Sequence, residues 1–431
     1  MRLLLSVAGV LGMSLMGCTV LDLSDNPEAY VDSVRYRRAI LERDLRETSS
    51  DYALLRLESY GLPAAAWELL PERDLPSRPL RDEDLERFQS GLPPVWDPAE
   101  ATALTPEELP SSEEEWVELG RRVFFDYPLR NDGVYGQLVR LESGLEDSGF
   151  LQDEDRWVGL RLFLDESGAL AVGNTCAQCH SSEDPEGGIS GRLSNRSMDI
   201  GAARLLVQGL TPGELPPELD STAIADLDRL GAGRADVLSD GLFNPFAFPD
   251  MGGLGDLPLL QHNANWDHGG TASLAIRCET LFITANLGRS RIPRVLSWAL
   301  ASYFRSLEPP PPLRSGEEVP PAAAEGEELF EEIGCADCHV PPLYTSPEPV
   351  PVAVVGTDST ATDSSARGTG SYRVPSLRGV SAKAPYLHHG AVESLEDLLD
   401  PARLDEEPGH VFGTELGDEE RAALIVFLET L

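Results

Sequence analysis

Two cysteine motifs constrain this chain more than any other feature of its sequence. They read Cys-Ala-Gln-Cys-His at residues 176–180 and Cys-Ala-Asp-Cys-His at residues 335–339. A Cys-x-x-Cys-His run is typical of covalent haem attachment, in which both thiols bond to the haem and the adjacent histidine coordinates the iron. Two such runs predict two covalently bound haem c groups. The predicted attachment residues are Cys176, Cys179, Cys335 and Cys338, and the predicted proximal iron ligands are His180 and His339.

A Cys-x-x-Cys pair also occurs in zinc sites and in thiol redox centres. A structural zinc site needs two further ligands nearby, whereas Cys179 and Cys335 lie far apart in the chain. A thioredoxin-like motif does not need a histidine directly after its second cysteine, yet a histidine follows in both motifs. Haem attachment is therefore favoured, and zinc binding and dithiol chemistry are the alternatives.

The N-terminus has the pattern of an export signal that ends at a cysteine. One arginine, Arg2, precedes a short apolar stretch, and residues 15–18 read Leu-Met-Gly-Cys. The stretch is too short to span a membrane comfortably and fits a cleavable signal. Because residues 15–18 resemble a bacterial lipobox, we predict a lipoprotein signal peptide at 1–17 and lipidation at Cys18. An ordinary signal peptide is the alternative. Thr19 follows the cysteine, so we expect an anchor at the periplasmic face of the outer membrane.

The chain is strongly acidic. It has 73 Asp and Glu residues against 34 Lys and Arg, which gives a formal net charge of −39. Such a charge disfavours nucleic acid and anionic membrane surfaces as partners. General solubility explains it better than docking of a basic redox partner, because the acidic residues are spread along the chain. Apart from Cys18 and the motif cysteines only Cys278 remains, so we expect it to be a buried thiol and no disulfide framework to exist.

Local patterns predict mostly helices. Apolar residues at helical spacing indicate one helix near Val31–Leu57, and Ser112 fits the cap of a helix that runs through Phe124. Alternating residues over Leu160–Val172 predict a hairpin just before the first motif. Four consecutive prolines at 309–312 mark the clearest domain boundary. Further helices are expected over Ile292–Leu307, Gly326–Gly334 and Asp418–Leu431, with Asp418 as the cap of the last.

Several segments resemble the bacterial di-haem cytochrome c peroxidase superfamily. That superfamily also includes the di-haem enzyme of methylamine utilisation and, more distantly, rubber oxygenase. The resemblance implies two cytochrome c-like helical domains with a haem in each, electrons entering at one haem and being used at the other. The matching segments are Leu119–Asp126, Trp266–Asp267, Tyr372–Val380, Ala384–Gly390, Ser394–Leu398 and Phe412–Leu416, which together extend over about residues 112–431.

The predicted fold is therefore mainly α, with two cytochrome c-like haem domains, short β-hairpin and loop insertions, and an N-terminal helical arm. Beyond the signal peptide at 1–17, we predict an N-terminal arm or stalk at 18–111, a first haem domain at 112–308, a proline-rich linker at 309–323 and a second haem domain at 324–431. A helix precedes each motif, which indicates a loose internal duplication.

The resemblance also implies roles for three residues outside the motifs. Arg373 and Arg378 are expected to bind haem propionates, since a guanidinium pairs well with a carboxylate. A surface ion pair is their alternative role. Trp266 matches a tryptophan that lies between the two haems in the peroxidases, where it would carry electrons between them. Simple core packing is its alternative.

The resemblance is weaker for the ligand on the far side of the second haem. Peroxidases of this superfamily commonly use a methionine at a position that is Ala402 here. His388 matches a histidine that looks like the distal ligand in rubber oxygenase, and we predict it as the second ligand. His389 and His410 are the alternatives.

The first haem has fewer candidates on its far side. The peroxidases' displaceable loop histidine is missing, because no histidine occurs between His180 and His262. Met198 is the candidate ligand, with a packed core methionine as its alternative role; His262 and His268 are further candidates. Around the position of the superfamily's distal glutamate, this chain has Asn, Leu and Gly at 286–288. Peroxide cleavage would therefore lack its usual acid–base group.

These features predict a lipid-anchored periplasmic di-haem cytochrome. It would relay electrons through the second haem to a more open first haem that reduces hydrogen peroxide or a related oxidant. A pure electron carrier and a rubber-oxygenase-like enzyme that uses dioxygen are the alternatives. The expected electron donor is a small redox protein, a cytochrome or a cupredoxin. The lipid would be the only membrane contact, and no nucleic acid is expected. Some peroxidases hold calcium between their domains, but no motif for it is legible here and calcium is not predicted.

Overall fold

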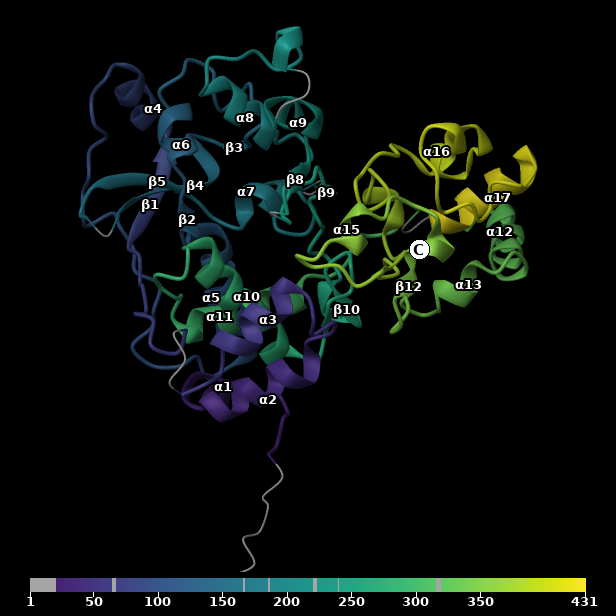
Figure 1. Cartoon of the computed structure of the whole chain (residues 1–431), viewed down its shortest axis with the longest axis horizontal. Helices are drawn as coiled ribbons and strands as arrows, with labels where there is room; N and C mark the ends of the chain where they lie inside the picture. Colours follow the sequence, from purple (N-terminus) through teal and green to yellow (C-terminus); the bar gives the residue numbers. More distant parts are fainter. Residues whose placement is uncertain are drawn as a thin grey trace, which may run out of the picture.

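The computed structural model describes residues 21–431, apart from residues 64–66, 166, 185–186, 220–222, 239 and 315–318. The predicted signal peptide and the predicted lipidation site, Cys18, therefore lie outside the described residues. Figure 1 shows a larger lobe, coloured from purple to green, and a smaller lobe, coloured from green to yellow. In the part of the chain that is described, no helix is long and apolar enough to cross a membrane.

Helices with short paired strands make up both lobes, in agreement with the predicted mainly helical fold. The N-terminal arm contains α1 (Pro27–Asp32), α2 (Val34–Asp44), α3 (Asp51–Ser59), β1 (Ser77–Arg81) and α4 (Asp82–Gln89). The rest of the larger lobe contains α5 (Glu113–Asp126), β2 (Arg130–Asn131), α6 (Gly133–Leu138), β3 (Gln152–Asp153), β4 (Arg156–Leu164), β5 (Leu170–Asn174), α7 (Ala177–His180), β6 (Ser182–Glu183), β7 (Ile189–Ser190), α8 (Ile200–Leu206), α9 (Ala223–Leu230), β8 (Arg234–Asp236), β9 (Pro245–Ala247), β10 (Leu259–Leu260), β11 (Trp266–Asp267), α10 (Thr271–Ala285) and α11 (Arg294–Ser306). The smaller lobe contains α12 (Pro321–Glu332), α13 (Cys335–Cys338), β12 (Val350–Pro351), α14 (Val352–Val355), α15 (Thr360–Asp363), β13 (Ser371–Tyr372), α16 (Leu395–Leu399) and α17 (Asp418–Leu428).

Each lobe contains one closely packed pair of helices. In the larger lobe α5 packs on α11, and in the smaller lobe α12 packs on α17. Both pairs cross at a glycine. A Cβ on Gly120 would overlap the carbonyl oxygen of Ala299, and a Cβ on Gly326 would overlap that of Ala423. Because only glycine permits so close an approach, the internal duplication predicted from the sequence extends to the packing of the helices.

Among the helices after the arm, the structure agrees with the predicted cap at Ser112 and differs at the C-terminal helix and the linker. Ser112 caps α5, since its Oγ accepts a hydrogen bond from Glu115 N at 3.2 Å. Asp418 is the first residue of α17 rather than its cap. The cap is Gly417, whose N–H donates to Glu420 Oε2 at 2.8 Å. The helix α12 begins at Pro321, inside the segment predicted as linker, because proline is well suited to the first turn of a helix.

Four strands between α5 and the first motif in the sequence form a five-stranded antiparallel sheet together with β1 of the arm. Its strands run in the order β1-β4-β5-β2, with β3 paired to β4. The strands β4 and β5 form the hairpin predicted over Leu160–Val172, and Leu162 lies opposite Val172. The edge strand β1 comes from the arm and pairs Ser77 with Phe163. The arm is therefore not only helical, because it completes this sheet.

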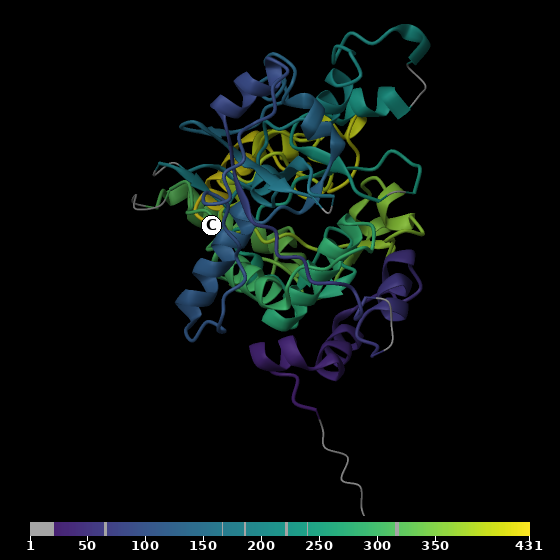
Figure 2. The same ribbon diagram turned by 90° about the vertical axis from the view of Figure 1, so that its left-hand side faces the viewer.

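The arm contains three short helices in place of the single helix predicted near Val31–Leu57. Ser33 has an extended backbone (φ −107°, ψ 102°) that ends α1, and its side chain caps α2 by accepting a hydrogen bond from Tyr36 N. The spacing of apolar residues is similar before and after Ser33, so the sequence pattern does not reveal that the helix is interrupted there. Both ribbon views show the purple arm helices close to the green helices of the larger lobe (Figures 1 and 2). Ile40 and Leu41 are fully buried in the core of that lobe, so this part of the arm is not a free stalk.

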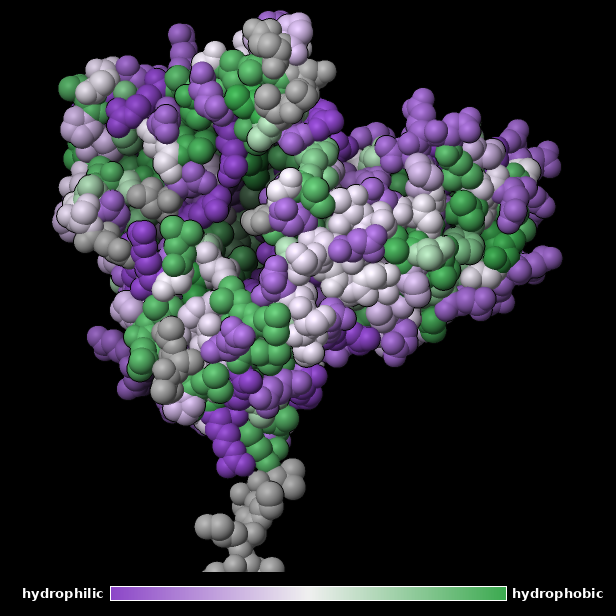
Figure 3. Space-filling view, in the orientation of Figure 1, coloured by the Kyte–Doolittle hydropathy of each residue, from purple (hydrophilic) through white to green (hydrophobic). Residues whose placement is uncertain are grey.

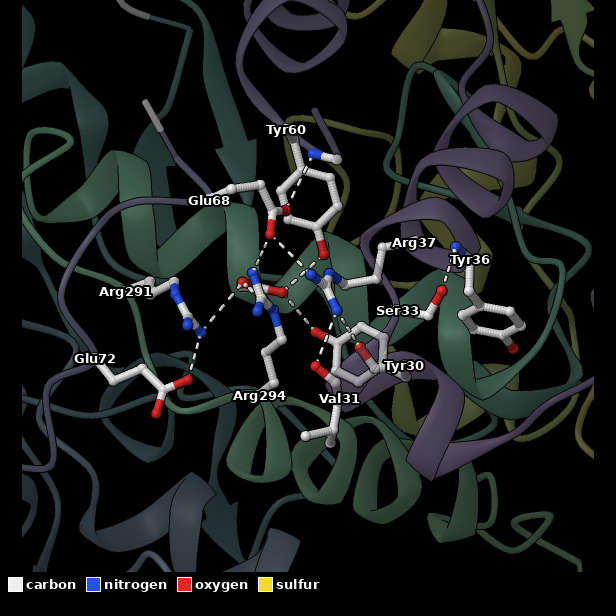
Figure 4. A network of polar contacts seen from close by, with 12 residues as sticks. Tyr30, Val31, Ser33, Tyr36, Arg37, Tyr60, Glu68, Glu72, Arg291 and Arg294 are labelled. Carbon is white, nitrogen blue, oxygen red and sulfur yellow. Dashed lines mark hydrogen bonds and ion pairs between the residues drawn. The ribbon is translucent and has the colours of Figure 1, made fainter. Parts of the chain in front are cut away.

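A buried carboxylate fixes the arm to the larger lobe. Glu279 of α10 is fully buried, and its Oε2 accepts hydrogen bonds from Tyr30 Oη at 2.8 Å and Tyr60 Oη at 2.7 Å. Arg294 Nε lies 3.2 Å from Glu279 Oε1. Burial and the Glu279 charge raise the pKa of both tyrosines well above the usual value, so they remain donors. Figure 4 shows the network around them, which also includes Arg37, Glu68, Glu72 and Arg291.

We expect Gly326→Ala to destabilise the smaller lobe, because the added Cβ would push α12 away from α17. The expected loss in the free energy of unfolding is about 1–3 kcal/mol, the range typical of overpacked cores. Gly136 in α6 is the matched control, since nothing lies within 4 Å of a Cβ built there. Urea unfolding followed by circular dichroism should give a lower midpoint for Gly326→Ala and an unchanged or higher one for Gly136→Ala. Equal midpoints would contradict the close crossing.

We expect Glu279→Ala to loosen the arm, because it removes one of the two carboxylates that pair with Arg294 and leaves two buried hydroxyls without an acceptor. Breaking a buried ion pair in this way costs about 3–5 kcal/mol. Glu72→Ala is the control: Glu72 Oε1 pairs with Arg291 at 2.6 Å, but its side chain is 49% exposed, so the cost is about 1 kcal/mol at most. Thermal unfolding and the rate of trypsin cleavage within the arm measure both effects. An arm equally resistant in the two variants would show that Glu279 does not hold it.

Candidate functional site

The second cysteine motif lies at the turn that follows α12. Gly334 has a left-handed backbone (φ 84°) between α12 and the short helix α13. His339 follows α13, and its Nδ1 lies 3.1 Å from the carbonyl oxygen of Tyr344. A carbonyl oxygen can only accept a hydrogen bond, so this contact places the ring proton on Nδ1. The Nε2 lone pair is left free for a metal.

A cavity of about 340 Å³ opens beside this motif. Cys335, Cys338 and His339 line it, together with apolar side chains of α12, α16 and α17. A largely apolar cavity with two thiols and a free imidazole nitrogen in its wall fits a covalently attached haem. The apolar residues include Phe330, Leu395, Leu398, Leu399, Leu424 and Leu428.

His410 brings a second imidazole to this cavity. Its ring centroid lies 6.5 Å from that of His339, with 64° between the ring planes. Burial, followed by the charge of His339, lowers the pKa of His410 to about 4, so its ring is neutral at physiological pH. Its Nδ1 is buried and has no hydrogen-bond partner in the described part of the chain.

The backbone at His410 is held in a costly conformation. Its φ is 49°, in the left-handed region that a non-glycine residue rarely adopts. The His410 N–H donates to the Val355 carbonyl at 2.7 Å, and its own carbonyl accepts from Arg403 Nη2 at 3.1 Å. Arg403 also donates to the Gly409 carbonyl at 2.9 Å. These contacts hold the loop so that the imidazole reaches the cavity.

His388, the predicted distal ligand of the second haem, lies in a stack of rings. Its ring stacks on Tyr372 with centroids 4.5 Å apart, and Phe246 of the larger lobe lies edge-on at 5.9 Å. Burial, followed by the neighbouring histidines, lowers the pKa of His388 to about 2. His388 lines the cavity, but over the described ranges no ring contact joins it to His339. The structure therefore brings His410, rather than His388, into ring contact with His339.

Basic side chains also line this cavity. Arg373 is half-buried, its Nε has no hydrogen-bond partner among the residues described, and burial lowers its pKa to about 10. Burial is also the main cause that lowers the pKa of Lys383 to about 8. A carboxylate bound here would offset the cost of burying both charges, which suits a propionate. Arg378 instead pairs with Asp256 of the larger lobe at 2.5 Å, which is its alternative role as a surface ion pair.

The first motif repeats the arrangement of the second. The helix α7 carries His180, whose Nδ1 lies 3.0 Å from the Pro249 carbonyl oxygen, so Nε2 is again free. Burial raises the pKa of Cys176 and of Cys179 to about 12, and both are neutral thiols. Figure 3 shows a hollow with hydrophobic residues in its depth, in the part of the larger lobe where Figure 1 places α7.

The surroundings of His180 differ from those of His339. Among residues the structure describes, no second imidazole makes a ring contact with His180; its ring neighbour is Phe248, with centroids 6.4 Å apart. Met198 is fully buried, and its Sδ lies 4.0 Å from Cys179 Sγ. It belongs to the apolar cluster that includes side chains of β4 and β5. These are the contacts of a packed core methionine.

The remaining candidates for the first site lie elsewhere. His262 stacks on Phe246 beside the cavity of the smaller lobe. His268 Nδ1 lies 2.8 Å from the Leu257 carbonyl oxygen. Asn286, at the position of the peroxidases' glutamate, ends α10 and donates through Nδ2 to the carbonyls of Leu129 and Phe282 at 2.9 and 2.8 Å. None of these contacts brings an acid–base group to His180.

Trp266, the predicted electron bridge, is fully buried where the arm meets the larger lobe. Its Nε1–H donates to Ser273 Oγ at 2.8 Å, and its ring lies edge-on to Tyr52 of α3 at 6.4 Å. Leu45 of the arm forms a β-bridge with it. Sequence reasoning missed these arm contacts, because nothing local to Tyr52 or Leu45 indicates their distant partner.

Residues 371–406 match the family model described as RoxA-like, cytochrome c-like. This match confirms the predicted resemblance over that segment, which carries Arg373, Arg378 and His388. Two solved structures align with the chain at low identity. Hydrazine synthase of Kuenenia stuttgartiensis, pressurised with 20 bar xenon, is 17% identical with a TM-score of 0.40, over 82% of this chain and 93% of that chain. A MauG-like protein associated with microbial copper homeostasis is 16% identical with a TM-score of 0.37, over 76% of this chain and 91% of that chain. No curated protein matches the chain significantly.

The two motifs and the cytochrome c-like match indicate haem c as the cofactor. The free Nε2 of each motif histidine and the apolar cavity beside Cys335 fit this group. The described residues contain no cluster of three or more His, Cys, Asp or Glu side chains suited to a metal ion.

Proposed function

We propose that this chain is a di-haem c-type cytochrome oxidoreductase whose two haems have different roles. The observation that carries the proposal is the difference between its two cysteine motifs. Both motif histidines have a free Nε2, but within the described ranges only His339 has another imidazole in ring contact. Electrons would pass through the second haem, at Cys335 and Cys338, to the first haem, where a small oxidant is reduced.

His339 and His410 are the proposed iron ligands of the second haem. A bond between a metal and an imidazole nitrogen is about 2 Å long, so two imidazoles that would hold one iron must lie close to each other. The observed separation of 6.5 Å suits this arrangement. His410 replaces His388 as our preferred ligand, since the His388 ring stacks on Tyr372. Two histidine ligands give a lower potential than a histidine and a methionine and leave no open position, which suits electron relay.

Cys176, Cys179 and His180 would hold the first haem and leave one side of the iron open. Phe248 has no atom that can coordinate iron, and the Met198 side chain is packed in the core. When bound, the haem would supply one-electron chemistry and an open coordination position. The chain's own residues fix the His180 ring through the Pro249 carbonyl and keep the surroundings apolar.

The oxidant is hydrogen peroxide or a related small molecule in this proposal. Asn286 ends α10, and no carboxylate stands at the position of the peroxidases' glutamate. Peroxide reduction would therefore lack the rate gain of about 10²- to 10⁴-fold that an acid–base group typically provides. The RoxA-like match over residues 371–406 favours a second candidate, an enzyme that uses dioxygen to cleave an organic substrate.

We further propose that the protein is exported and lipid-anchored through Cys18 at the periplasmic face of the outer membrane. Covalent haem attachment takes place on exported apoproteins, which agrees with the N-terminal pattern. The electron donor would be a small redox protein, such as a cytochrome or cupredoxin. A donor with a basic face would associate fastest with a chain of net charge −39.

Replacing His410 tests the second-haem ligand. We expect His410→Ala to convert the second haem from low-spin to high-spin, because the iron loses one strong ligand, and we expect added imidazole to restore the low-spin spectrum. His388→Ala is the matched control and should keep the low-spin spectrum. Electron paramagnetic resonance and absorption spectra measure the spin state. The reverse pattern would return the ligand role to His388.

Ligand addition tests the open first haem. In the reduced protein we expect carbon monoxide to bind one haem only, and in the oxidised protein we expect peroxide to change the spectrum of the same haem. A His410→Ala variant should bind carbon monoxide at both haems. If neither haem responds to carbon monoxide or peroxide, the result would favour the pure electron carrier over an enzyme. Dioxygen consumption without a peroxide response would favour the second candidate.

A further inference from the structure

Three arginines meet around one tyrosine between the arm and the two lobes. Arg56 of α3 is 3% exposed, and its guanidinium carbon lies 3.4 Å from the centre of the Tyr52 ring. Arg367, in the segment after α15, lies 5.1 Å from the same ring centre. The third arginine is Arg277 of α10. Burial raises the pKa of Tyr52, yet the charges of the three arginines lower it overall, so positive potential is concentrated at this point.

No carboxylate balances this cluster. In the described part of the chain none of the three forms an ion pair, although the chain has 73 acidic residues against 34 basic ones. Among the described residues, the Arg56 guanidinium donates to Thr280 Oγ1 at 3.2 Å and to the Tyr52 carbonyl at 3.0 Å, both uncharged. Burial and the other two arginines lower the pKa of Arg56 to about 9, against the opposing effect of Tyr52. Arg56 is buried, whereas Arg277 and Arg367 are partly exposed. Bringing like charges together costs free energy, which a bound anion would offset.

The cluster adjoins the first cysteine motif. Arg277 lies on α10 and directly precedes Cys278 in the chain. Cys278, the next residue, packs in the same core as Cys176. In Figure 1 the labels of α7 and α10 lie on either side of the hollow that Figure 3 shows.

We propose that Arg56, Arg277 and Arg367 bind the propionate carboxylates of the first haem. This inference rests on the proposed function, because it takes a haem at Cys176 and Cys179 as given. Two propionates would carry two negative charges into a site of three positive ones. A guanidinium also forms paired hydrogen bonds with a carboxylate, so the geometry of the partners agrees with their charge. A small free carboxylate would offer the same chemistry and is the competing source.

This assignment makes the first haem a junction of three parts of the chain. Arg56 comes from the arm, Arg277 from the core of the larger lobe and Arg367 from the smaller lobe. The arm already contacts the smaller lobe at this point, since the N–H groups of Asp51 and Tyr52 donate to two carbonyls of residues 365–366 at 3.0 and 2.9 Å. The propionates would therefore hold the arm and both lobes together.

The midpoint potentials of the two haems test the proposal. Intact-mass measurement first counts the haems on each variant, and a missing haem would count against the proposed function rather than this inference. In Arg56→Gln and Arg367→Gln, loss of a positive charge beside a propionate should stabilise the oxidised first haem. We expect about a tenfold lower equilibrium constant for its reduction, which is about 59 mV for one electron. The second haem should keep its potential, and Arg56→Lys should restore that of the first.

Arg46→Gln is the matched control from the same arm. Arg46 already pairs with Asp267 at 2.8 Å and Glu348 at 3.8 Å, so its loss should leave both potentials unchanged. An unchanged first-haem potential in both cluster variants would overturn the proposal, even if they unfold at lower temperature. Titration with sodium acetate separates the two sources of carboxylate. A first-haem potential that shifts with acetate in the unmodified protein, but not in Arg56→Gln, would show a free-anion site and would also overturn it.

Discussion

The close crossing of two helices at a glycine is the contact on which each lobe depends. The missing side chains of Gly120 and Gly326 allow one helix to rest against the backbone of the other. Four residues further along each helix an aromatic ring fills the space beside the crossing. The ring pairs are Phe124 with Tyr303, at 5.3 Å, and Phe330 with Phe427, at 5.4 Å. In the smaller lobe α12 leads directly into the cysteine motif, so this crossing also sets the position of the thiols.

Features that depend on neighbouring residues could be predicted from the sequence, and features set by distant contacts could not. The cysteine spacing, the Ser112 cap and the hairpin before the first motif are local, and the structure shows the last two as expected. The ring contact of His410 depends on a strained loop held by Arg403, which leaves no periodic signal. A family resemblance pointed to His388 instead, because it compares sequence positions and cannot show which ring reaches His339.

The charge of the chain could be counted from the sequence, but its placement could not. An excess of acidic residues suggests that every buried arginine would find a carboxylate. Arg294 does so by pairing with Glu279. Glu279 also accepts a hydrogen bond from Tyr30, which lies 249 positions away in the sequence. Arg56, in the arm, finds none among the residues described, and its neighbours Arg277 and Arg367 carry the same sign. The interface around Arg294 therefore has its charges paired within the chain, whereas the proposed propionates would pair with Arg56.

The two proposed haem sites therefore differ in how much of the chain each one needs. The residues proposed to hold the second haem, from Cys335 to His410, all belong to the smaller lobe. The first site combines Cys176 and His180 of the larger lobe with arginines of the arm and the smaller lobe. A site that gathers residues from three parts of the chain responds to any movement between them, since each guanidinium moves with its own element. The proposed iron ligands of the second haem come from one lobe, although larger-lobe residues such as Phe248 and His262 also line its cavity. That arrangement suits steady electron relay, and the first site is where the arrangement of arm and lobes can affect the chemistry.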